Sequence, residues 1–329
     1  MMKDFKHVNA RTVDEAISLL KSCKGVANLI AGGTDLLGIL KDRILPNYPD
    51  TIINLKTIQN LDYIMEDGEC LKIGALVKLE DIAQSPLIRE RYRILADAAK
   101  AVATPQIRNL GTIGGNLCQD VRCLYYRYPH QMGGRLLCKR KGSGPCFAVT
   151  GDNRYNAIMG GEGCFAVCPS DMAVVFTALD ADIKVAGADG TKLIPIKDFY
   201  TNSGNVLGAT DIITECRIPF PSNNERSAFL KFRLRDSIDF AIVSVASSIT
   251  ITKGLCEEAR IVLGAAAPVP MRVSEAEELI KGKAPTEEVA EQAACIAVEK
   301  ANPLSMNAYK IQIAKNLVKQ SILAAGSNP

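Results

Sequence analysis

The segment Ala31-Gly32-Gly33-Thr34-Asp35 lies between a strand-like apolar run, residues 26–30, and an apolar-periodic helix that begins at Leu36. A glycine turn between a strand and a helix exposes backbone N–H groups that can bind a phosphate. The segment is neither the GxGxxG dinucleotide fingerprint nor the GxxxxGK phosphate loop. By itself, a turn of this kind is structural more often than it is functional.

A second segment of similar character, Thr112-Ile113-Gly114-Gly115-Asn116, strengthens the case for a phosphate ligand. Arg108 stands just before it. Two such turns in neighbouring α/β units could clamp a diphosphate from two sides, because buried phosphate oxygens need hydrogen-bond donors. Threonine hydroxyls and glycine N–H groups supply those donors.

The elements around these segments predict a chain of class α+β. Predicted strands cover residues 26–30, 51–55, 71–75, 182–186 and 212–219, and predicted helices begin near residues 13, 36 and 79 and cover 92–103 and 172–179. A loop-like composition at residues 219–224 places a domain boundary there. We therefore expect domains at 1–221 (with subdomains at about 1–57 and 58–221) and at 222–329. The second domain is predicted to hold three strands, 228–234, 241–252 and 259–266, followed by helices at 274–281, 286–301 and 307–324.

Composition excludes several classes of function. Of 329 residues, 47% are hydrophobic and 23% charged, and the net charge of +3 is too small to indicate nucleic-acid binding. No apolar run is long enough to span a membrane. The first residues lack the apolar core of a secretion signal, so the eleven cysteines are expected to be reduced thiols or metal ligands in the cytoplasm.

Six of the cysteines lie between the second glycine segment and Asp171, namely Cys118, Cys123, Cys138, Cys146, Cys164 and Cys168. The sequence between them has neither a helical nor a strand period. A long structureless insert in a compact domain needs something that holds it, and several thiolates around one metal centre would do so. No CxxC pair is present, which argues against a zinc ribbon or a ferredoxin-type run. Six cysteines allow 15 sets of four, so spacing alone leaves the ligands open.

Together with Pro169-Ser170-Asp171, the two glycine segments resemble the FAD-binding subunit of the molybdenum hydroxylase (xanthine oxidase) family, over essentially the whole chain. The resemblance implies a vanillyl-alcohol-oxidase (PCMH)-type FAD-binding domain. A C-terminal α+β domain like that of CO dehydrogenase flavoproteins would follow, with a three-stranded antiparallel sheet and helices. It implies non-covalent FAD, because neither His7 nor His130 lies in a flavin-facing turn. The residues that it assigns to FAD are Leu29, Ile30, Ala31, Gly32, Gly33, Thr34, Asp35, Leu36, Thr112, Ile113, Gly114, Gly115, Asn116, Asp171, Ile213 and Lys231.

The resemblance also implies separate roles within this set. Residues 29–36 would wrap the diphosphate and ribityl chain, and residues 112–116 would hold the other side of the diphosphate. Asp171 would lie near the adenine-linked or ribityl hydroxyls, and Ile213 and Lys231 would line the isoalloxazine or its access. An exposed strand lysine is an equally good interpretation of Lys231.

Ordinary members of the family pass almost directly from the Gly-Gly-Asn turn to the Pro-Ser-Asp segment, whereas this chain inserts residues 119–166. It thereby resembles a subset, 4-hydroxybenzoyl-CoA reductases and a group of molybdenum aldehyde oxidoreductases, in which the insert carries a [4Fe–4S] cluster close to the flavin. Such a cluster takes four thiolates, and the resemblance implies Cys123, Cys138, Cys146 and Cys164. The other two cysteines of the insert region are expected to be small buried packing residues.

The resemblance implies an oxidoreductase subunit that passes electrons between FAD, its own cluster and partner subunits. The partners would be a large molybdopterin subunit, where substrate reacts, and a small [2Fe–2S] subunit, in a dimer of heterotrimers served by an external carrier such as ferredoxin. The complex would be like a 4-hydroxybenzoyl-CoA reductase, or alternatively an aldehyde oxidoreductase or xanthine dehydrogenase, and the direction of electron flow stays open. Two alternatives of other classes are a self-sufficient flavin oxidase and a zinc-stabilised binding protein without flavin.

Overall fold

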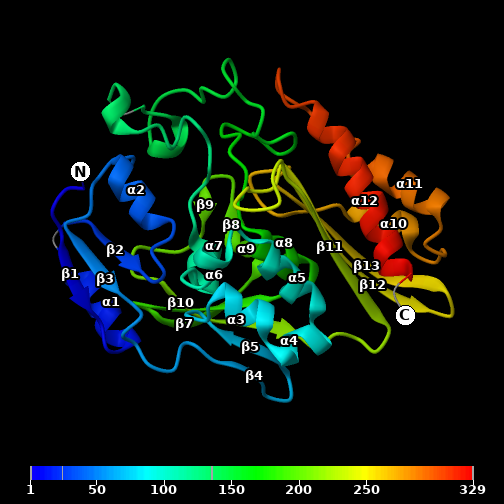
Figure 1. Cartoon of the computed structure of the whole chain (residues 1–329), viewed down its shortest axis with the longest axis horizontal. Helices are drawn as coiled ribbons and strands as arrows, with labels where there is room; N and C mark the ends of the chain where they lie inside the picture. The colour runs from blue at the N-terminus through cyan, green and yellow to red at the C-terminus, as the bar shows by residue number, and fades with distance from the viewer. Residues whose placement is uncertain (1, 24, 135, 328–329) are drawn as a thin grey trace.

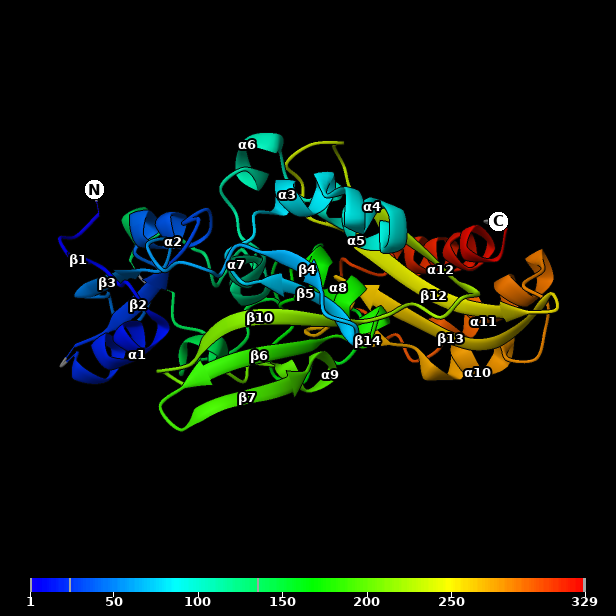
Figure 2. The same ribbon diagram turned by 90° about the horizontal axis from the view of Figure 1, so that it is seen from below.

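The computed structural model describes residues 2–23, 25–134 and 136–327. Three main sheets follow one another along the molecule, as Figures 1 and 2 show. The first is parallel, with the order β1-β3-β2, and consists of β1 (Lys6–Asn9), β2 (Ala27–Ile30) and β3 (Thr51–Asn54). Parallel strands need crossover connections, which α1 (Val13–Ser22) and α2 (Leu36–Asp42) supply. Thr12 caps α1 as its sequence predicts, because its hydroxyl accepts the N–H of Glu15 at 3.1 Å.

The second sheet is antiparallel and joins segments from before and after the insert. Its order is β4-β5-β10-β6-β7, formed by β4 (Ile64–Glu66), β5 (Cys70–Gly74), β10 (Ile212–Pro219), β6 (Asp182–Gly187) and β7 (Gly190–Pro195). The helices of this part are α3 (Leu79–Gln84), α4 (Pro86–Arg91), α5 (Arg93–Ala101), α6 (Pro105–Arg108), α7 (Ile113–Cys118), α8 (Asp171–Ala178) and α9 (Ile196–Phe199). A small hairpin of β8 (Tyr200–Thr201) and β9 (Gly204–Asn205) follows α9.

The insert between α7 and α8 contains no strand in its described part. Its regular elements are two 3-10 turns, η1 (His130–Met132) and η2 (Lys139–Lys141). The insert crosses the top of the molecule in Figure 1, from α2 to the helices of the C-terminal part. The side-chain amide of Gln131 donates to the carbonyl of Lys41 in α2 at 2.7 Å, and the hydroxyl of Tyr309 donates to the carbonyl of Arg154 at 2.9 Å. The insert therefore contacts both ends of the fold.

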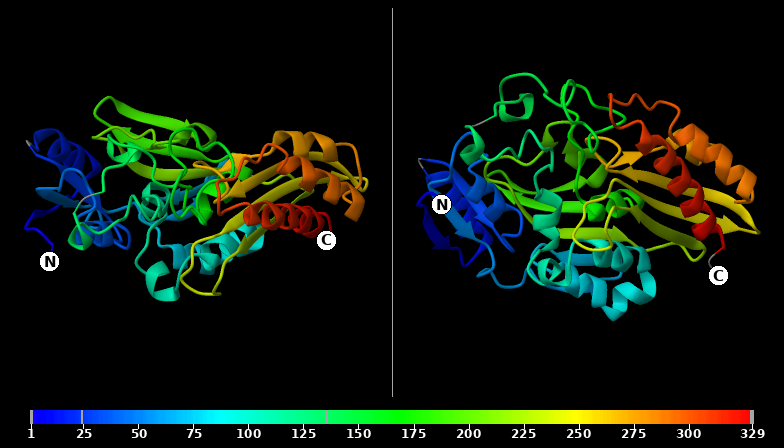
Figure 3. Two further views of the ribbon diagram at one scale, coloured as in Figure 1. Left: turned by 90° about the horizontal axis from the view of Figure 1, so that it is seen from above. Right: turned by 45° about the horizontal axis from the view of Figure 1, so that its top comes forward.

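The C-terminal part is an antiparallel sheet with helices on one side (Figure 3). Its strands are β11 (Glu225–Phe232), β12 (Val243–Thr252), β13 (Leu255–Gly264) and β14 (Met271–Arg272), and its helices are α10 (Ser274–Ile280), α11 (Glu287–Ala297) and α12 (Tyr309–Ser327). The prediction of three strands was wrong by one. Strand β14 has two residues, which pair with Leu263 and Val262, and two residues are too few to show an alternating pattern.

Helix α8 joins the cores of the second and third sheets. All eight of its residues are buried, as expected for a helix that is apolar on every side. It packs against α5 on one side and against β12 and β13 on the other. The same core therefore includes Ala246 and Val262 of the C-terminal sheet, and the N-terminus of α8 is fixed between the two parts. In the described part of the chain, no helix is long and apolar enough to cross a membrane.

Candidate functional site

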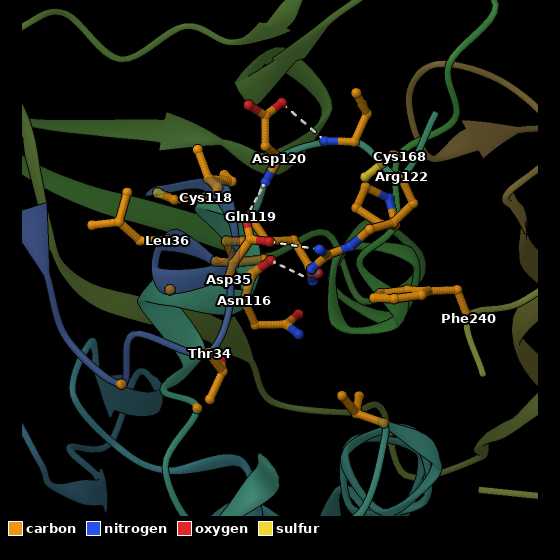
Figure 4. Close-up of a pocket in the computed structure, with 18 of the residues that line it drawn as sticks. Thr34, Asp35, Leu36, Asn116, Cys118, Gln119, Asp120, Arg122, Cys168 and Phe240 are labelled. Atoms are coloured by element: carbon orange, nitrogen blue, oxygen red, sulfur yellow. Dashed lines mark hydrogen bonds and ion pairs between the residues drawn. The ribbon is translucent and has the colours of Figure 1, made fainter. Parts of the chain in front are cut away.

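A cavity of about 630 Å³ lies between the parts of the chain that carry the three sheets (Figure 4). Its volume is within the range of small-molecule sites. Its walls come from the segment after β2, from α7 and the start of the insert, from the start of α8, and from the loop that follows β11. All eight residues predicted between Leu29 and Leu36 line it.

At this cavity the first glycine segment touches Leu110 and Gly111, the two residues just before the second segment. A Cβ atom added to Gly32 would lie 2.0 Å from the carbonyl oxygen of Leu110, so no larger residue fits there without movement. Gly33 has a φ of +71°, a conformation that glycine adopts readily. The structure thus brings together the two segments, which are far apart in the sequence, and leaves backbone rather than side chain at their junction.

The second segment is the start of a helix rather than an isolated turn. Thr112 is the N-cap of α7, and its hydroxyl accepts the N–H of Gly115 at 3.2 Å. Thr112, Gly115 and Asn116 line the cavity. Ile113 and Gly114 are buried, and the N–H of Gly114 donates to the carbonyl of Ala75 at 2.9 Å. These last two residues therefore support the wall instead of forming it.

Asp171 and Lys231 form an ion pair in the cavity wall. The Nζ atom of Lys231 lies 2.7 Å from Oδ2 of Asp171, and the two side chains are 5% and 6% exposed. Lys231 also donates to the carbonyl of Ala101 at 3.0 Å. The interpretation of Lys231 as an exposed strand lysine was therefore wrong. Ile213 is not among the described residues that line the cavity, and its side chain lies in the core beneath the second sheet.

Arg108 does not reach the cavity either. Its Nε atom pairs with Glu80 at 2.7 Å, and the guanidinium donates to the carbonyls of Lys100 and Val102 at 3.1 and 3.0 Å. The position of Arg108 before the second glycine segment reflects this structural contact, which ties α6 to α3 and to the end of α5.

Asp35 connects the first glycine segment to the insert. Its Oδ1 atom lies 2.6 Å from Arg122 and 2.7 Å from Arg127, and its Oδ2 atom accepts the N–H of Asp120 at 2.8 Å. Figure 4 shows Arg122 beside both Asp35 and Phe240, and its guanidinium carbon lies 4.5 Å from the centroid of the Phe240 ring. These partners were not predicted, because ion pairs between residues so far apart in the sequence leave no local pattern.

The four cysteines that the sequence singled out line one small pocket of the insert. Cys123, Cys138, Cys146 and Cys164 surround it together with aromatic side chains that include Tyr126. Cys118 and Cys168 line the larger cavity instead, and while Cys168 is buried as expected, Cys118 is exposed to that cavity.

The described side chains of the cysteine pocket are not arranged to hold a single metal ion. Among the described residues, no group of three or more His, Cys, Asp or Glu side chains is placed to hold one metal ion. A [4Fe–4S] cluster bonds each thiolate to a different iron, which spreads its ligands further apart than those of one ion. The void is about 10 Å³, so the four side chains must move outward to admit a cluster.

Three of these cysteines each begin a turn. The carbonyl groups of Cys123, Cys138 and Cys146 accept N–H groups three or four residues later, at 2.9, 2.8 and 3.2 Å. Burial raises the pKa of Cys123, while the N–H groups of Tyr126 and Tyr125 and the amide of Asn156 favour its thiolate. Four thiols around one pocket are the kind of donor set that a [4Fe–4S] cluster takes.

Comparison with known proteins identifies the family. Residues 3–221 match the FAD binding domain in molybdopterin dehydrogenase, and residues 227–325 match the CO dehydrogenase flavoprotein C-terminal domain. The chain belongs to the FAD-binding subunits of the molybdenum hydroxylases. The expected fold is confirmed, and the alternative of a binding protein without flavin was wrong.

Similar proteins share almost the full length of this FAD-binding subunit. The aldehyde oxidoreductase FAD-binding subunit of Escherichia coli K12 is 34% identical over 333 residues, which cover 98% of each chain. The nicotinate dehydrogenase FAD-subunit of Eubacterium barkeri is 31% identical and covers 88% of this chain and 84% of its own. A chain of carbon monoxide dehydrogenase from Hydrogenophaga pseudoflava superposes with a TM-score of 0.79 at 26% identity, over 99% of this chain and 98% of that one.

Proposed function

We propose that this FAD-binding subunit transfers electrons between FAD in the large cavity and a [4Fe–4S] cluster on Cys123, Cys138, Cys146 and Cys164. The observation that carries the proposal is the convergence of these four cysteines on one pocket. Cys118 and Cys168, although they belong to the same stretch of sequence, line the other cavity. If the six cysteines served only to pack the interior, nothing would require four of them to line one pocket and the other two to line a different cavity.

The protein positions the two centres and limits their contact with water. When bound, FAD takes up electrons in pairs and releases them singly, and a cluster carries one electron at a time. Gly32 and Gly33 line the cavity and carry no side chain, so their backbone can approach a diphosphate closely. Lys231 and Asp171 add one charge of each sign within the wall, and Tyr126 and Phe147 cover the cysteine pocket.

Substrate chemistry would take place on partner subunits. We propose a large molybdopterin subunit and a small [2Fe–2S] subunit, in a dimer of heterotrimers, with an external carrier such as ferredoxin. Similar proteins bear names such as medium chain and complex subunit alpha, which supports assembly with other chains. The isolated chain should exchange electrons only with carriers and dyes.

Two reactions of the complete complex are candidates. The insert supports a 4-hydroxybenzoyl-CoA reductase-like enzyme, and the 34% identity to an aldehyde oxidoreductase subunit over 98% of both chains supports aldehyde oxidation. The purified complex separates them. Reduction of a dye by aldehydes supports the second reaction, whereas oxidation of a low-potential reduced dye by 4-hydroxybenzoyl-CoA supports the first.

The cluster is tested by the visible spectrum together with iron and acid-labile sulfide assays. The wild-type chain should show flavin peaks with a broad absorbance beside them and should contain iron. Cys123→Ser should lose iron and keep flavin, whereas Cys168→Ser and the remote control Cys256→Ser should keep both. Iron loss from Cys168→Ser but not from Cys123→Ser would overturn the ligand assignment, and a flavin-loaded wild type without iron would overturn the cluster.

A further inference from the structure

Two residues of the insert are shared between the flavin cavity and the cysteine pocket. Tyr126 and Arg140 line both spaces, and among the described residues no other residue does so. Tyr126 is 7% exposed, and the side chain of Arg140 is 11% exposed. They therefore form a wall that separates the two spaces and excludes most water from between them.

Asp120 holds both side chains of this wall. The hydroxyl of Tyr126 donates to Oδ2 of Asp120, and Nε of Arg140 lies 3.5 Å from Oδ1 of the same carboxylate. The guanidinium carbon of Arg140 also lies 5.7 Å from the centroid of the Tyr126 ring. Burial and the charge of Asp120 raise the pKa of Tyr126, so its hydroxyl keeps its proton at neutral pH.

The same carboxylate residue connects the wall to the first glycine segment. The N–H of Asp120 donates to Asp35 at 2.8 Å, and Asp35 lines the flavin cavity. On the other side, Tyr126 follows Cys123 by three residues and Arg140 follows Cys138 by two. The wall is thus attached at one side to the flavin cavity and at the other to two of the proposed cluster ligands.

We propose that Tyr126 and Arg140 are the bridge across which electrons pass between the flavin and the cluster, with Arg140 setting the potentials at its two sides. The inference rests on the proposed function, because it needs both centres. In each step one electron crosses the wall: the flavin is oxidised by one electron and the cluster is reduced by one, or the reverse, and protons that the flavin loses or gains are exchanged with water.

The two side chains contribute in different ways. Electrons pass more readily through bonded atoms than through an empty gap. The ring of Tyr126 fills the space between the two centres with bonded atoms, so electron exchange should slow when the ring is removed. The positive charge of Arg140 is poorly screened because it is buried. It stabilises the reduced, more negative form of each neighbouring centre, and Asp120 offsets part of this effect.

The test uses the complete complex with Tyr126→Leu, Tyr126→Phe, Arg140→Gln and Arg140→Lys. Iron and FAD contents are measured first, then flavin–cluster electron exchange by stopped-flow absorbance and the potentials by redox titration. Tyr126→Leu should slow the exchange severalfold, and Tyr126→Phe should restore it. Arg140→Gln should lower the cluster potential, and Arg140→Lys should keep it close to that of the wild type. Tyr155→Leu, an exposed tyrosine of the same insert, is the matched control.

The outcomes separate this inference from the proposed function. Suppose that the wild type holds iron, that flavin–cluster electron exchange is unchanged in Tyr126→Leu, and that the potentials are unchanged in Arg140→Gln. The bridge is then wrong, while the cluster stands. A wild type without iron overturns both. If Tyr126→Leu loses its iron, the potential of Arg140→Gln decides, since that variant leaves the aromatic wall in place.

Discussion

At the scale of single residues, the pair of Lys231 and Asp171 is the most buried ion pair among the described residues of the cavity wall. Both side chains are almost fully buried and lie 2.7 Å apart. Removing one partner of such a pair leaves an uncompensated buried charge, which costs about 3–5 kcal/mol. We expect Lys231→Met to lose stability on this scale and to bind FAD more weakly, measured by urea denaturation and flavin fluorescence.

The double variant Lys231→Met, Asp171→Asn is the matched control for this prediction. It removes both charges, so it should recover part of the lost stability. A double variant no more stable than the single variant would contradict the ion pair as the source of the loss.

Lys310 predicts a dependence of stability on pH. It is fully buried, and its Nζ atom donates to the carbonyls of Asn156 and Ala265 at 2.9 and 2.6 Å. Burial lowers its pKa from 10.5 to about 7. Between these two values the unfolded chain binds more protons than the folded chain, so the contribution of Lys310 to stability rises with pH. That contribution stays at its least favourable level below about pH 7.

Urea denaturation at about pH 7 and about pH 8.5 measures this effect; thiols, with pKa values of roughly 8.5, ionise partly at the upper pH, and they do so in every variant compared. The free energy of unfolding of the wild type should rise between the two pH values relative to Lys310→Met. The exposed Lys281→Met should behave as the wild type does. Equal slopes for the wild type and Lys310→Met would show that the buried amine stays charged.

At the scale of elements, the surroundings of two glycines predict opposite effects of an added methyl group. Gly32→Ala places a Cβ atom 2.0 Å from the carbonyl of Leu110 and must displace one segment, so FAD should bind much more weakly. Gly38 lies in α2, and no atom lies within 4 Å of an added Cβ. Gly38→Ala should therefore keep FAD and gain about 0.5–1 kcal/mol in urea denaturation. Normal FAD affinity in Gly32→Ala would contradict a close contact between Gly32 and the carbonyl of Leu110 in the FAD-binding protein.

Elements with a local pattern were predictable from the sequence. Strand β10 has the predicted bounds, Ile212–Pro219, because apolar residues recur along it and Ile212, Ile213, Cys216 and Ile218 are buried. Helix α4 was missed, since Ser85-Pro86 looks like a stop, whereas Ser85 caps a new helix with proline at its first position. Residues 112–116, which were predicted as a turn, are the start of α7. Glycine is unfavourable in a helix, so the two glycines of this segment kept the cap at Thr112 from being recognised.

The candidate site was predictable where the family resemblance assigned a residue. Spacing alone left 15 sets of four cysteines open. The resemblance implied Cys123 and its three companions, which lie together. Arg140 was not predicted, because an arginine in a loop is ordinary. What distinguishes Arg140 and Tyr126 is their place between the two spaces. Their common partner Asp120 gave no signal either.

At the scale of the whole molecule, Asn307 connects the C-terminal part to the cysteine pocket. It is fully buried and donates to the carbonyls of Asn156 and Ala157, both at 3.1 Å. The side-chain amide of Asn156 in turn lies 4.0 Å from the sulfur of Cys123. Asn307→Ala leaves buried carbonyls with fewer partners and should cost about 1–3 kcal/mol. It should also speed the loss of iron to a chelator, because the loop that supports Cys123 is loosened.

Exposed Asn223→Ala is the control for both measurements. If Asn307→Ala is destabilised but retains iron as well as the wild type does, the C-terminal part supports the fold without supporting the pocket.

The hydrogen bond between Ser170 and Asn116 joins the two ends of the insert. The hydroxyl of Ser170 donates to Oδ1 of Asn116 at 2.6 Å, and both residues are buried. This hydrogen bond holds the two ends of the insert together. Lengthening a loop whose ends are held in this way costs only about 0.6 kcal/mol for each doubling of its length. An insert of this kind could therefore be gained or lost by a flavin domain during evolution. A short Gly-Ser linker in place of residues 121–150 removes Cys123, Cys138 and Cys146 but keeps Asn156 and Ala157, whose carbonyls bind the buried Lys310 and Asn307. This variant should be a folded, yellow protein without iron.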